Sequence, residues 1–374
     1  MSDPLGAITR VSYLELFFDL VFVFAITVTT VTTATDLTGI ELYQGLLVLA
    51  LLWWAWVGYS WLGTTVRADQ GPMALMFLGA MGAMLLVTVL VPNWYAGDSA
   101  AVVAATAYVG VRVLHLLVFR RVGRGNPELQ TAAARLAIGV GIGAVLLLVG
   151  AVIGGTAQIV LVTLAVLFDL GGALLGGGRG WVVSIPHFAE RYALIIIIAL
   201  GEAIIATGIA SITTVITVQV VVSILIAFAL TAAIWWAYFR SVAEPLEHAI
   251  AAAPVERQPA LARDVYSYLH FLPVLGIFLI ALALKKVIAK VGDKGLLAQF
   301  YDVPAFALGA GVVLILLALI LMRVRAGVPV PRTAWLGLAI AGVVGSIALS
   351  IPAVVVTAGM LAAIAVAAKR PAAA

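Results

Sequence analysis

Residues 304–323, PAFALGAGVVLILLALILMR, form an apolar run of twenty residues in which the only charge is the final arginine. An α-helix needs about 20 mostly apolar residues to cross a hydrocarbon core roughly 30 Å thick. We therefore predict a membrane-spanning helix here. The run is about twice as long as a strand of a membrane β-barrel, and polar and apolar residues do not alternate along it.

Eleven further apolar runs predict about twelve spans in all, so the expected fold class is an all-α polytopic membrane protein. The predicted spans are residues 12–34, 42–64, 72–92, 99–120, 134–154, 157–176, 187–211, 217–240, 263–289, 304–323, 334–350 and 352–368. Only Ser350, Ile351 and Pro352 separate the last two. Since a proline can kink a helix within a membrane instead of ending it, eleven spans with one kinked helix is an alternative.

Composition supports the membrane class and excludes several others. Of the 374 residues, 64% are hydrophobic and 10% are charged, whereas a soluble domain carries about 25% charged residues. Cysteine is absent, which excludes disulfides and thiolate metal sites, and we expect no metal or cofactor. The net charge of +4 does not indicate a nucleic-acid partner, because the basic residues cluster in short loops between apolar runs. The predicted partner is the lipid bilayer.

Lysine and arginine are distributed unequally between alternate loops, and this asymmetry predicts the orientation of the chain. With the N-terminus in the cytoplasm, sixteen of the 21 basic residues fall on the cytoplasmic side. The outer side holds a cluster after the ninth span: Lys285, Lys286, Lys290 and Lys294. We expect both termini in the cytoplasm, and the lysines indicate that the ninth helix continues beyond the membrane.

An internal repeat is indicated by two aromatic motifs, WWAW at residues 53–56 and WWAY at residues 235–238, which are 182 residues apart. A shift of similar length places Asp19 against Glu202. Because the shift covers six spans, the two halves have the same orientation, as in transporters built from parallel repeats. We predict two membrane halves of six helices each, residues 1–178 and 179–374.

Ionisable residues within the spans are the candidate functional residues, because each costs roughly 2.5 kcal/mol or more at the centre of a bilayer. Glu15 and Asp19 are four residues apart and share one helix face, with their side chains about 6 Å apart. Two carboxylates this close in a low dielectric do not readily ionise together without a nearby cation. The pair is therefore either a proton or cation site, or a structural ion pair with a neighbouring helix.

Arg112 and His115 share a face of the fourth span, and Arg112 lies about 12 Å of helix rise from the predicted cytoplasmic end. Asp19 lies at a similar depth in the first span. The matching depths predict an ion pair of Arg112 with Asp19 or Glu15. Such a pair either contributes to an ion pathway or fixes the register of two helices.

Three more candidates follow in the second half. Arg191 precedes Glu202 by eleven residues, which is three turns along one helix face. Glu202 lies near the middle of the seventh span, where a carboxyl group is either a proton site or a protonated donor to another helix. His270, shortly before Pro273 in the ninth span, is either a proton relay or a hydrogen-bonded core residue.

Two segments resemble motifs of the bacterial low temperature requirement A (LtrA) family. They are VSYLELFFDLVF at residues 11–22, and the segment that runs from ERY at residues 190–192 to ALGEAI at residues 199–204. Length and span number fit the family too, so the resemblance covers nearly the whole chain. It implies a multi-pass protein of the bacterial inner membrane, linked by the family name to growth in the cold. The motifs mark out Glu15, Asp19, Arg191 and Glu202.

Three functions fit these features. The first is a transporter or channel-like protein, and not an enzyme, in which the embedded carboxylates pass a proton, a cation or a small solute between the halves. The second is a membrane-embedded enzyme acting on a lipid or prenyl substrate, with Glu15 and His115 as acid and base. It is disfavoured because HExxH, GxSxG and Asp-rich motifs are absent. The third is a structural or sensory membrane protein in which the acids only lock helices together.

Overall fold

The computed structural model describes residues 10–65, 68–175 and 183–369, and this part of the chain is helical apart from its connections. The first seven α-helices are α1 (Tyr13–Thr35), α2 (Gly39–Gly63), α3 (Gly71–Val89), α4 (Ser99–Val122), α5 (Pro127–Ile153), α6 (Gly155–Leu175) and α7 (Ile185–Ile212). A short 3₁₀ turn, η1 (Val91–Asn93), lies between α3 and α4.

The C-terminal part includes two long helices that contain π-helical turns. The first comprises α8 (Val218–Tyr238), the π-helical η2 (Phe239–Ala243) and α9 (Glu244–Ala251). The second comprises α10 (Gln258–Ala262), the π-helical η3 (Arg263–Leu269) and α11 (Phe271–Lys294). The remaining helices are α12 (Asp302–Ala326), α13 (Arg332–Ser346) and α14 (Ala353–Ala367). The described residues thus form twelve continuous helical segments, which confirms the all-α class. Helix α11 reaches Lys294, five residues past the predicted end of the ninth span at residue 289, and its extension beyond the membrane stays a prediction.

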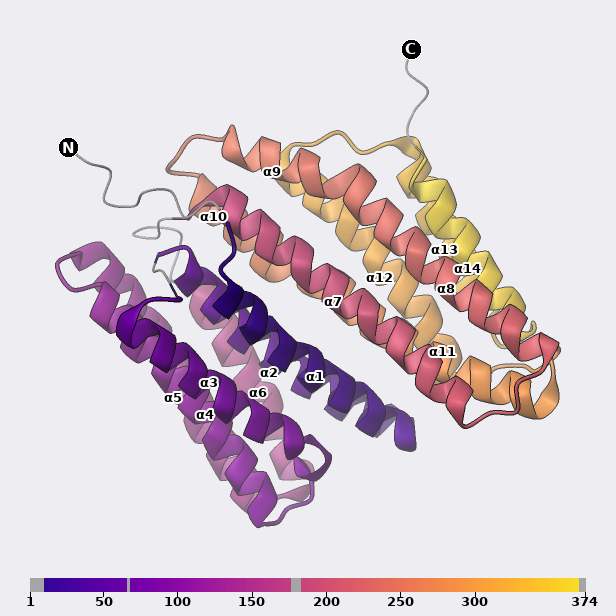
Figure 1. Cartoon of the computed structure of the whole chain (residues 1–374), viewed down its shortest axis with the longest axis horizontal. Coiled ribbons are helices and arrows are strands. Elements are labelled where there is room, and N and C mark those ends of the chain that lie inside the picture. Colours follow the sequence, from indigo (N-terminus) through magenta and orange to yellow (C-terminus); the bar gives the residue numbers. More distant parts are fainter. Residues whose placement is uncertain (1–9, 66–67, 176–182, 370–374) are drawn as a thin grey trace. The chain divides into compact units, whose positions relative to one another are not determined.

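Ten of these segments are long and apolar enough to cross a membrane, so the chain is a multi-pass protein of a lipid bilayer. Helices α13 and α14 have 15 residues each. By helix rise they are about 22 Å long, which is shorter than a hydrocarbon core of about 30 Å. Pro352, the N-cap residue of α14, is extended (φ −56°, ψ 140°), and the two helices pack side by side (Figure 1). The alternative of one kinked helix at this end is therefore wrong.

The chain divides into two compact units. Unit 1 comprises Met1–Thr32, Tyr43–Arg191 and Ala253–Arg263, and unit 2 comprises Thr33–Leu42, Tyr192–Ala252 and Asp264–Ala374. Helix α7 therefore begins in unit 1 and ends in unit 2. The predicted halves, residues 1–178 and 179–374, stay a prediction.

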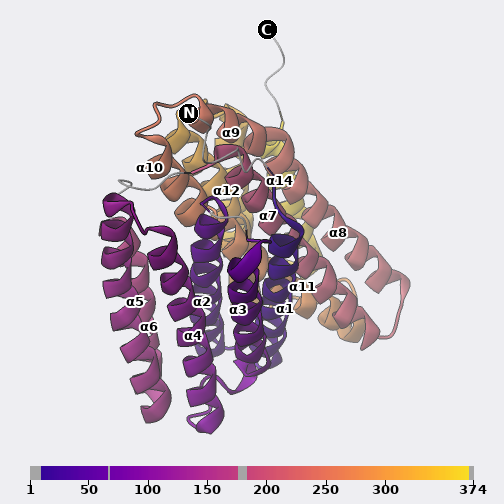
Figure 2. The same ribbon diagram turned by 60° about the vertical axis from the view of Figure 1, so that its left-hand side comes forward.

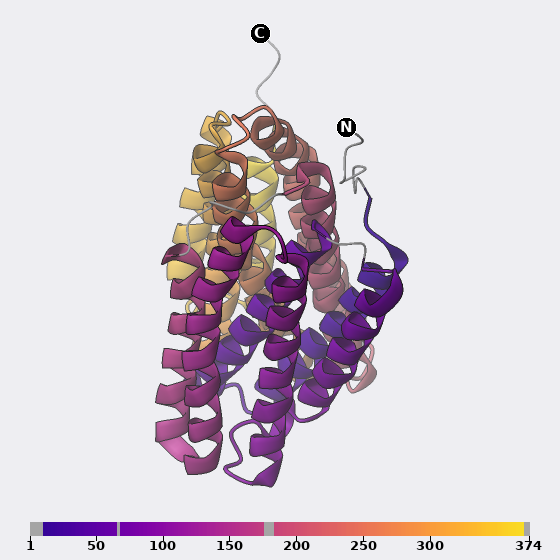
Figure 3. The same cartoon turned by 90° about the vertical axis from the view of Figure 1, so that its left-hand side faces the viewer.

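In unit 1, Tyr59 of α2 connects three neighbouring helices. Its ring centroid lies 4.8 Å from that of Phe18 on α1 and 5.2 Å from that of Phe77 on α3. Its hydroxyl donates a hydrogen bond to the Val111 carbonyl of α4 at 2.9 Å. Helices α5 and α6 lie side by side along their length (Figures 2 and 3). The described aromatic core of the unit is thus centred on α2.

In unit 2, helices α11 and α12 approach so closely that glycine is required at the contact. A Cβ atom at Gly276 would lie 2.5 Å from the Gly311 carbonyl oxygen and 2.7 Å from Ile315 Cγ1. The carbonyl belongs to the backbone of α12 and cannot rotate away. Close contact between backbones is the usual way in which helices associate in membranes.

We therefore expect Gly276→Ala to lower the stability of the folded protein by about 1–3 kcal/mol, because the added methyl group overpacks the contact. Thermal unfolding of the purified chain in detergent measures the effect. The matched control is Gly208→Ala on the unit 2 part of α7, where a Cβ would meet no atom within 4 Å. Equal melting temperatures for the two variants would contradict this account of the contact.

Candidate functional site

The segment Ser12-Tyr13-Leu14-Glu15 begins α1 as a capping box, in which the N-cap residue and the residue three positions later exchange hydrogen bonds. The Glu15 N–H donates to Ser12 Oγ at 3.3 Å, and both the N–H and the hydroxyl of Ser12 donate to Glu15 Oε2 at 2.9 Å. Asp19 lies one turn further along the same face. Both acids are buried, with exposed fractions of 2% and 1%.

Arg191 of α7 binds both carboxylates at once. Its Nη1 donates to Glu15 Oε1 at 2.8 Å, and its Nη2 donates to Asp19 Oδ1 at 2.7 Å. The guanidinium group is itself fully buried. A planar guanidinium carries several donors in fixed directions, whereas the ammonium group of lysine is a compact point charge. One cation therefore holds two anions in a fixed geometry.

Two further side chains complete this group. Trp56 of α2 donates its Nε1–H to Asp19 Oδ1 at 2.8 Å, and its ring centroid lies 5.5 Å from Arg191 Cζ, a cation–π contact. His187 Nε2 lies 3.3 Å from Glu15 Oε2. We name these five residues, Glu15, Asp19, Trp56, His187 and Arg191, the acid–arginine cluster. All of them belong to unit 1.

The acid–arginine cluster also requires a glycine on α2. A Cβ atom at Gly63 would overlap the Glu15 Oε1 atom and would lie 3.3 Å from His187 Cε1. Both the carboxylate and the imidazole therefore occupy the space that a side chain at this position would take. The absence of a side chain at Gly63 is what lets α2 pack against this part of α1.

The net charge of the cluster depends on His187, whose Nε2 lies within ion-pair distance of Glu15. Two carboxylates and one guanidinium leave one net negative charge when His187 is neutral. Asp19 Oδ1 and both oxygens of Glu15 accept hydrogen bonds, but Asp19 Oδ2 is buried and has no hydrogen-bond partner among the described residues. A proton added at Asp19 Oδ2 would neutralise the cluster and leave the hydrogen bonds to Oδ1 in place. The arrangement is therefore suited to binding one proton.

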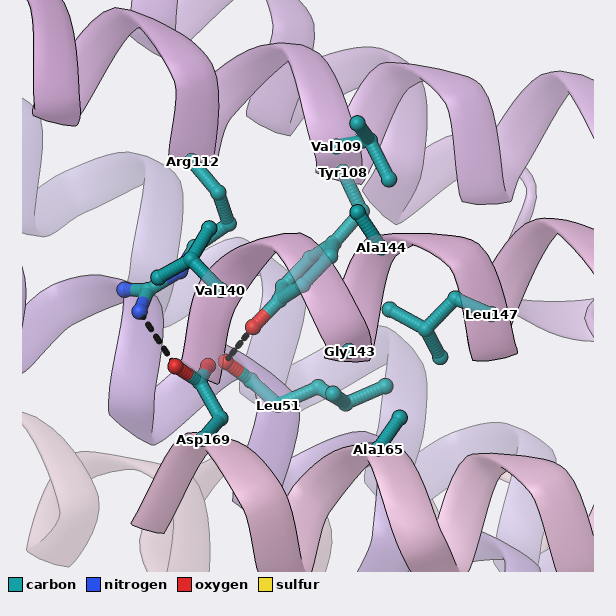
Figure 4. A pocket seen from close by; sticks show the side chains of 10 residues that line it. All are labelled: Leu51, Tyr108, Val109, Arg112, Val140, Gly143, Ala144, Leu147, Ala165 and Asp169. Atoms are coloured by element: carbon teal, nitrogen blue, oxygen red, sulfur yellow. Dashed lines mark hydrogen bonds and ion pairs between the residues drawn. The ribbon is translucent and has the colours of Figure 1, made fainter. Parts of the chain in front are cut away.

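Arg112 of α4 belongs to a different ion pair. Its Nη2 donates to Asp169 Oδ1 of α6 at 2.6 Å (Figure 4), and its Nη1 donates to the Trp54 carbonyl oxygen at 3.1 Å. The predicted pair of Arg112 with Asp19 or Glu15 is therefore wrong. Equal depth in the membrane does not make two helices neighbours, and α6 supplies the carboxylate instead.

The surroundings of the Arg112–Asp169 pair leave little free space. Both residues line a small cavity of about 10 Å³, close to the room that one water molecule needs. Tyr108, at the same cavity, donates its hydroxyl hydrogen to the Leu51 carbonyl at 2.9 Å (Figure 4). His115, one turn beyond Arg112, packs its ring against Tyr59 and Phe119 at centroid distances of 5.5 and 4.8 Å. The histidine within hydrogen-bond distance of Glu15 is His187, not His115.

Unit 2 holds the remaining two candidates. Glu202 is buried on the part of α7 that belongs to this unit. His270 donates its Nδ1–H to the Val265 carbonyl at 2.8 Å, so its neutral ring accepts the Tyr238 hydroxyl hydrogen at Nε2, also at 2.8 Å. Tyr238 directly precedes η2 and His270 directly follows η3. Such π-helical turns are frequent at functional sites.

Sequence reasoning missed three partners of the candidate residues. Asp169 lies within the predicted sixth span, residues 157–176, but was not taken as a partner of Arg112, and its carboxylate is buried. His187 was not among the candidates, although its four-residue spacing from Arg191 places both on one face of α7. Trp56 was noted only as part of the aromatic repeat. The spacing rule would have found His187, whereas no signal within α2 pairs Trp56 with Asp19.

Comparison with known proteins gives one family and one relative. The family model described as "Bacterial low temperature requirement A protein (LtrA)" matches residues 10–369. A protein of Rhizobium meliloti (strain 1021), named Uncharacterized protein RA0937, is 26% identical over 284 residues. The match covers 72% of this chain and 67% of that protein. No solved structure matches the chain.

Substitution of Arg191 should destabilise the protein. The loss should depend on whether the new side chain keeps the positive charge. Arg191→Gln leaves two buried carboxylates without their cation, and we expect a loss of about 3–5 kcal/mol. Arg191→Lys keeps the charge but loses one of the two hydrogen bonds to a charged group, for about 1.5–3 kcal/mol. Thermal unfolding in detergent measures both losses. Arg124→Gln, at an exposed position after α4, is the control. If Arg191→Gln were as stable as this control, the ion pairs would not hold the cluster together.

Proposed function

This chain belongs to the bacterial low temperature requirement A family, and we propose that it is a transporter or channel-like protein that carries protons across the inner membrane on embedded carboxylates. In this role the chain transports protons and catalyses no reaction. It rests on the acid–arginine cluster, in which a buried carboxyl group is placed to take up one proton.

Asp19 is the proposed proton carrier. Its Oδ1 is held by Arg191 and Trp56, while its Oδ2 has no partner among the described residues. Loss of the proton strengthens the attraction between Asp19 and Arg191, and uptake weakens it, because the interaction is that of a full charge pair in a low dielectric. Proton binding therefore changes how strongly α1 is held to α7. Such a change in helix contact is what a proton-coupled transport cycle requires.

The other candidate residues have supporting roles in this proposal. Glu15 anchors Arg191 from the first turn of α1, and Arg191 sets the charge balance at Asp19. Glu202 and the Tyr238–His270 pair are proposed to handle protons within unit 2, where the hydroxyl and the imidazole already share a hydrogen bond. In unit 1, Arg112 neutralises Asp169, with His115 close by.

We further propose that the two membrane halves are parallel repeats. The repeated aromatic motifs lie on α2 and α8, and their last residues, Trp56 and Tyr238, are equivalent under the 182-residue shift. Each donates a hydrogen bond to an ionisable side chain, Trp56 to Asp19 and Tyr238 to His270. Aromatic donors at equivalent positions are expected if both halves derive from one ancestral unit. Their acceptors, Asp19 and His270, are not equivalent, because the shift matches Asp19 with Glu202.

Proton flux in proteoliposomes tests the proposed function. With a pH-sensitive dye inside and an imposed pH gradient, we expect the wild-type chain to dissipate the gradient. Asp19→Asn cannot ionise and should reduce the rate to that of protein-free liposomes, and Glu202→Gln should lower it. Asp98→Asn is the matched control, because Asp98 is exposed and asparagine can still act as the N-cap of α4.

The same variants separate transport from a purely structural role. If Asp19→Asn and Glu202→Gln conducted like the wild type and only melted at lower temperature, the acids would serve to lock helices, and the proposed function would be wrong. Circular dichroism and size-exclusion chromatography establish that each variant is folded before flux is compared.

We also propose that both termini lie in the cytoplasm. The N-terminus and the C-terminus lie on the same side whether ten or twelve helices cross the bilayer, because both numbers are even. One of the sixteen basic residues that the sequence places on the cytoplasmic side is Arg191, which is buried in the cluster. The other fifteen of the 21 basic residues support this orientation. The lysines of the outer side all lie on α11.

Labelling with a membrane-impermeant maleimide tests the orientation, and the natural absence of cysteine makes each introduced thiol unique. In intact cells we expect Lys294→Cys to react, because it is exposed near the outer end of α11. Arg124→Cys is also exposed, and we expect it to react only after the cells are lysed. The reverse pattern would invert the orientation.

A further inference from the structure

A recess of about 440 Å³ lies in unit 2 between α8 and the end of α14. Its described lining consists of Ala233, Trp236, Arg240, Ala365, Ala368 and Lys369. Helices α8 and α14 pack against each other (Figure 1). The lining residues lie at or just beyond the C-terminal ends of these two helices. None of the described lining residues is among those assigned above to proton transport.

The charges that line the recess have one sign. Arg240 and Lys369 are both exposed cations, and the described lining contains no carboxylate. Arg240 Cζ lies 5.5 Å from the Trp236 ring centroid, so a cation–π contact orients the guanidinium group. Arginine with lysine is a pairing suited to a phosphate group, because the guanidinium binds two oxygens and the ammonium adds a point charge.

Two further arginines of unit 2 bind acceptors within the protein. Arg323 donates to the carbonyl oxygens of Ser241 and Pro329, and Arg325 donates to Asp264 Oδ2 at 2.6 and 2.9 Å. These cations stabilise the protein's own loops and helix ends. Arg240 and Lys369 are the charged side chains that the recess presents to its surroundings.

The position of Arg240 along α8 corresponds to the membrane interface. It lies 22 residues after Val218, the first residue of α8. By helix rise this is about 33 Å, close to the thickness of the hydrocarbon core. Trp236, one turn before it, is 52% exposed, and exposed tryptophans gather at the level of lipid headgroups. The alanines of the lining supply an apolar wall next to the two cations.

We propose that this recess binds the phosphate headgroup of an anionic phospholipid. Arg240 and Lys369 bind the phosphate oxygens, the Trp236 indole contacts the glycerol region, and the alanine wall contacts the first carbons of an acyl chain. An anionic lipid meets both the charge and the apolar lining, whereas free phosphate would meet only the charge. Basic pockets between membrane helices are known to bind anionic headgroups. The site is independent of the proposed proton transport.

Native mass spectrometry of the purified full-length chain, titrated with phosphatidylglycerol, tests the proposal. A basic residue near a membrane surface contributes about 1 kcal/mol to the binding of anionic lipid, so Arg240→Gln and Lys369→Gln should each weaken the tightest lipid site about fivefold. Arg124→Gln, an exposed arginine in unit 1, should leave the affinity unchanged. Phosphatidylglycerol with brominated acyl chains should quench the fluorescence of the wild type more than that of Trp236→Phe.

Two further titrations identify the source of the phosphate. Phosphatidylcholine should bind more weakly than phosphatidylglycerol, and inorganic phosphate should not displace the bound lipid. Equal binding of the two lipids, displacement by inorganic phosphate, or unchanged affinity in the double variant of Arg240 and Lys369 would each overturn the proposal.

Discussion

Hydrocarbon offers no hydrogen bonds, so every charge within a membrane protein must be met by another group of the protein. In unit 1 this requirement is met by arginine. Arg191 binds Glu15 and Asp19 together, and Arg112 binds Asp169. These contacts connect helices that are distant in the sequence, α1 with α7 and α4 with α6. The buried acids therefore constrain the fold, because each must lie next to a helix that carries its arginine.

The Arg112–Asp169 pair and the acid–arginine cluster differ in their ratio of carboxylates to arginines. The Arg112–Asp169 pair is electrically neutral and lines a cavity with room for about one water, as expected of a group that fixes helix register. The acid–arginine cluster has one carboxylate more than it has arginines, and Asp19 Oδ2 has no hydrogen-bond partner among the described residues. Asp19 Oδ2 is therefore the observation on which the proposed proton transport rests.

Sequence patterns predicted the helices well and their partners poorly. Span length depends on the thickness of the bilayer, a constraint that acts on each segment alone, so twelve runs could be read from hydropathy. An ion pair depends on which helices pack together, and depth carries no such information. Arg112 was therefore paired with Asp19 when its partner is Asp169. Glu15 and Asp19 were recognised because their spacing and motif lie within one helix, whereas Trp56 comes from another.

The capping box of α1 gives Glu15 two tasks at once. Its Oε2 closes the first turn through Ser12, while its Oε1 holds Arg191. Unwinding of that single turn would move the carboxylate and release one of the two anchors of a fully buried guanidinium. Fraying of a helix end, normally the least consequential motion in a protein, would in this chain expose an unbalanced charge to lipid. The first turn of α1 is therefore part of the same network of contacts that holds α1 to α7.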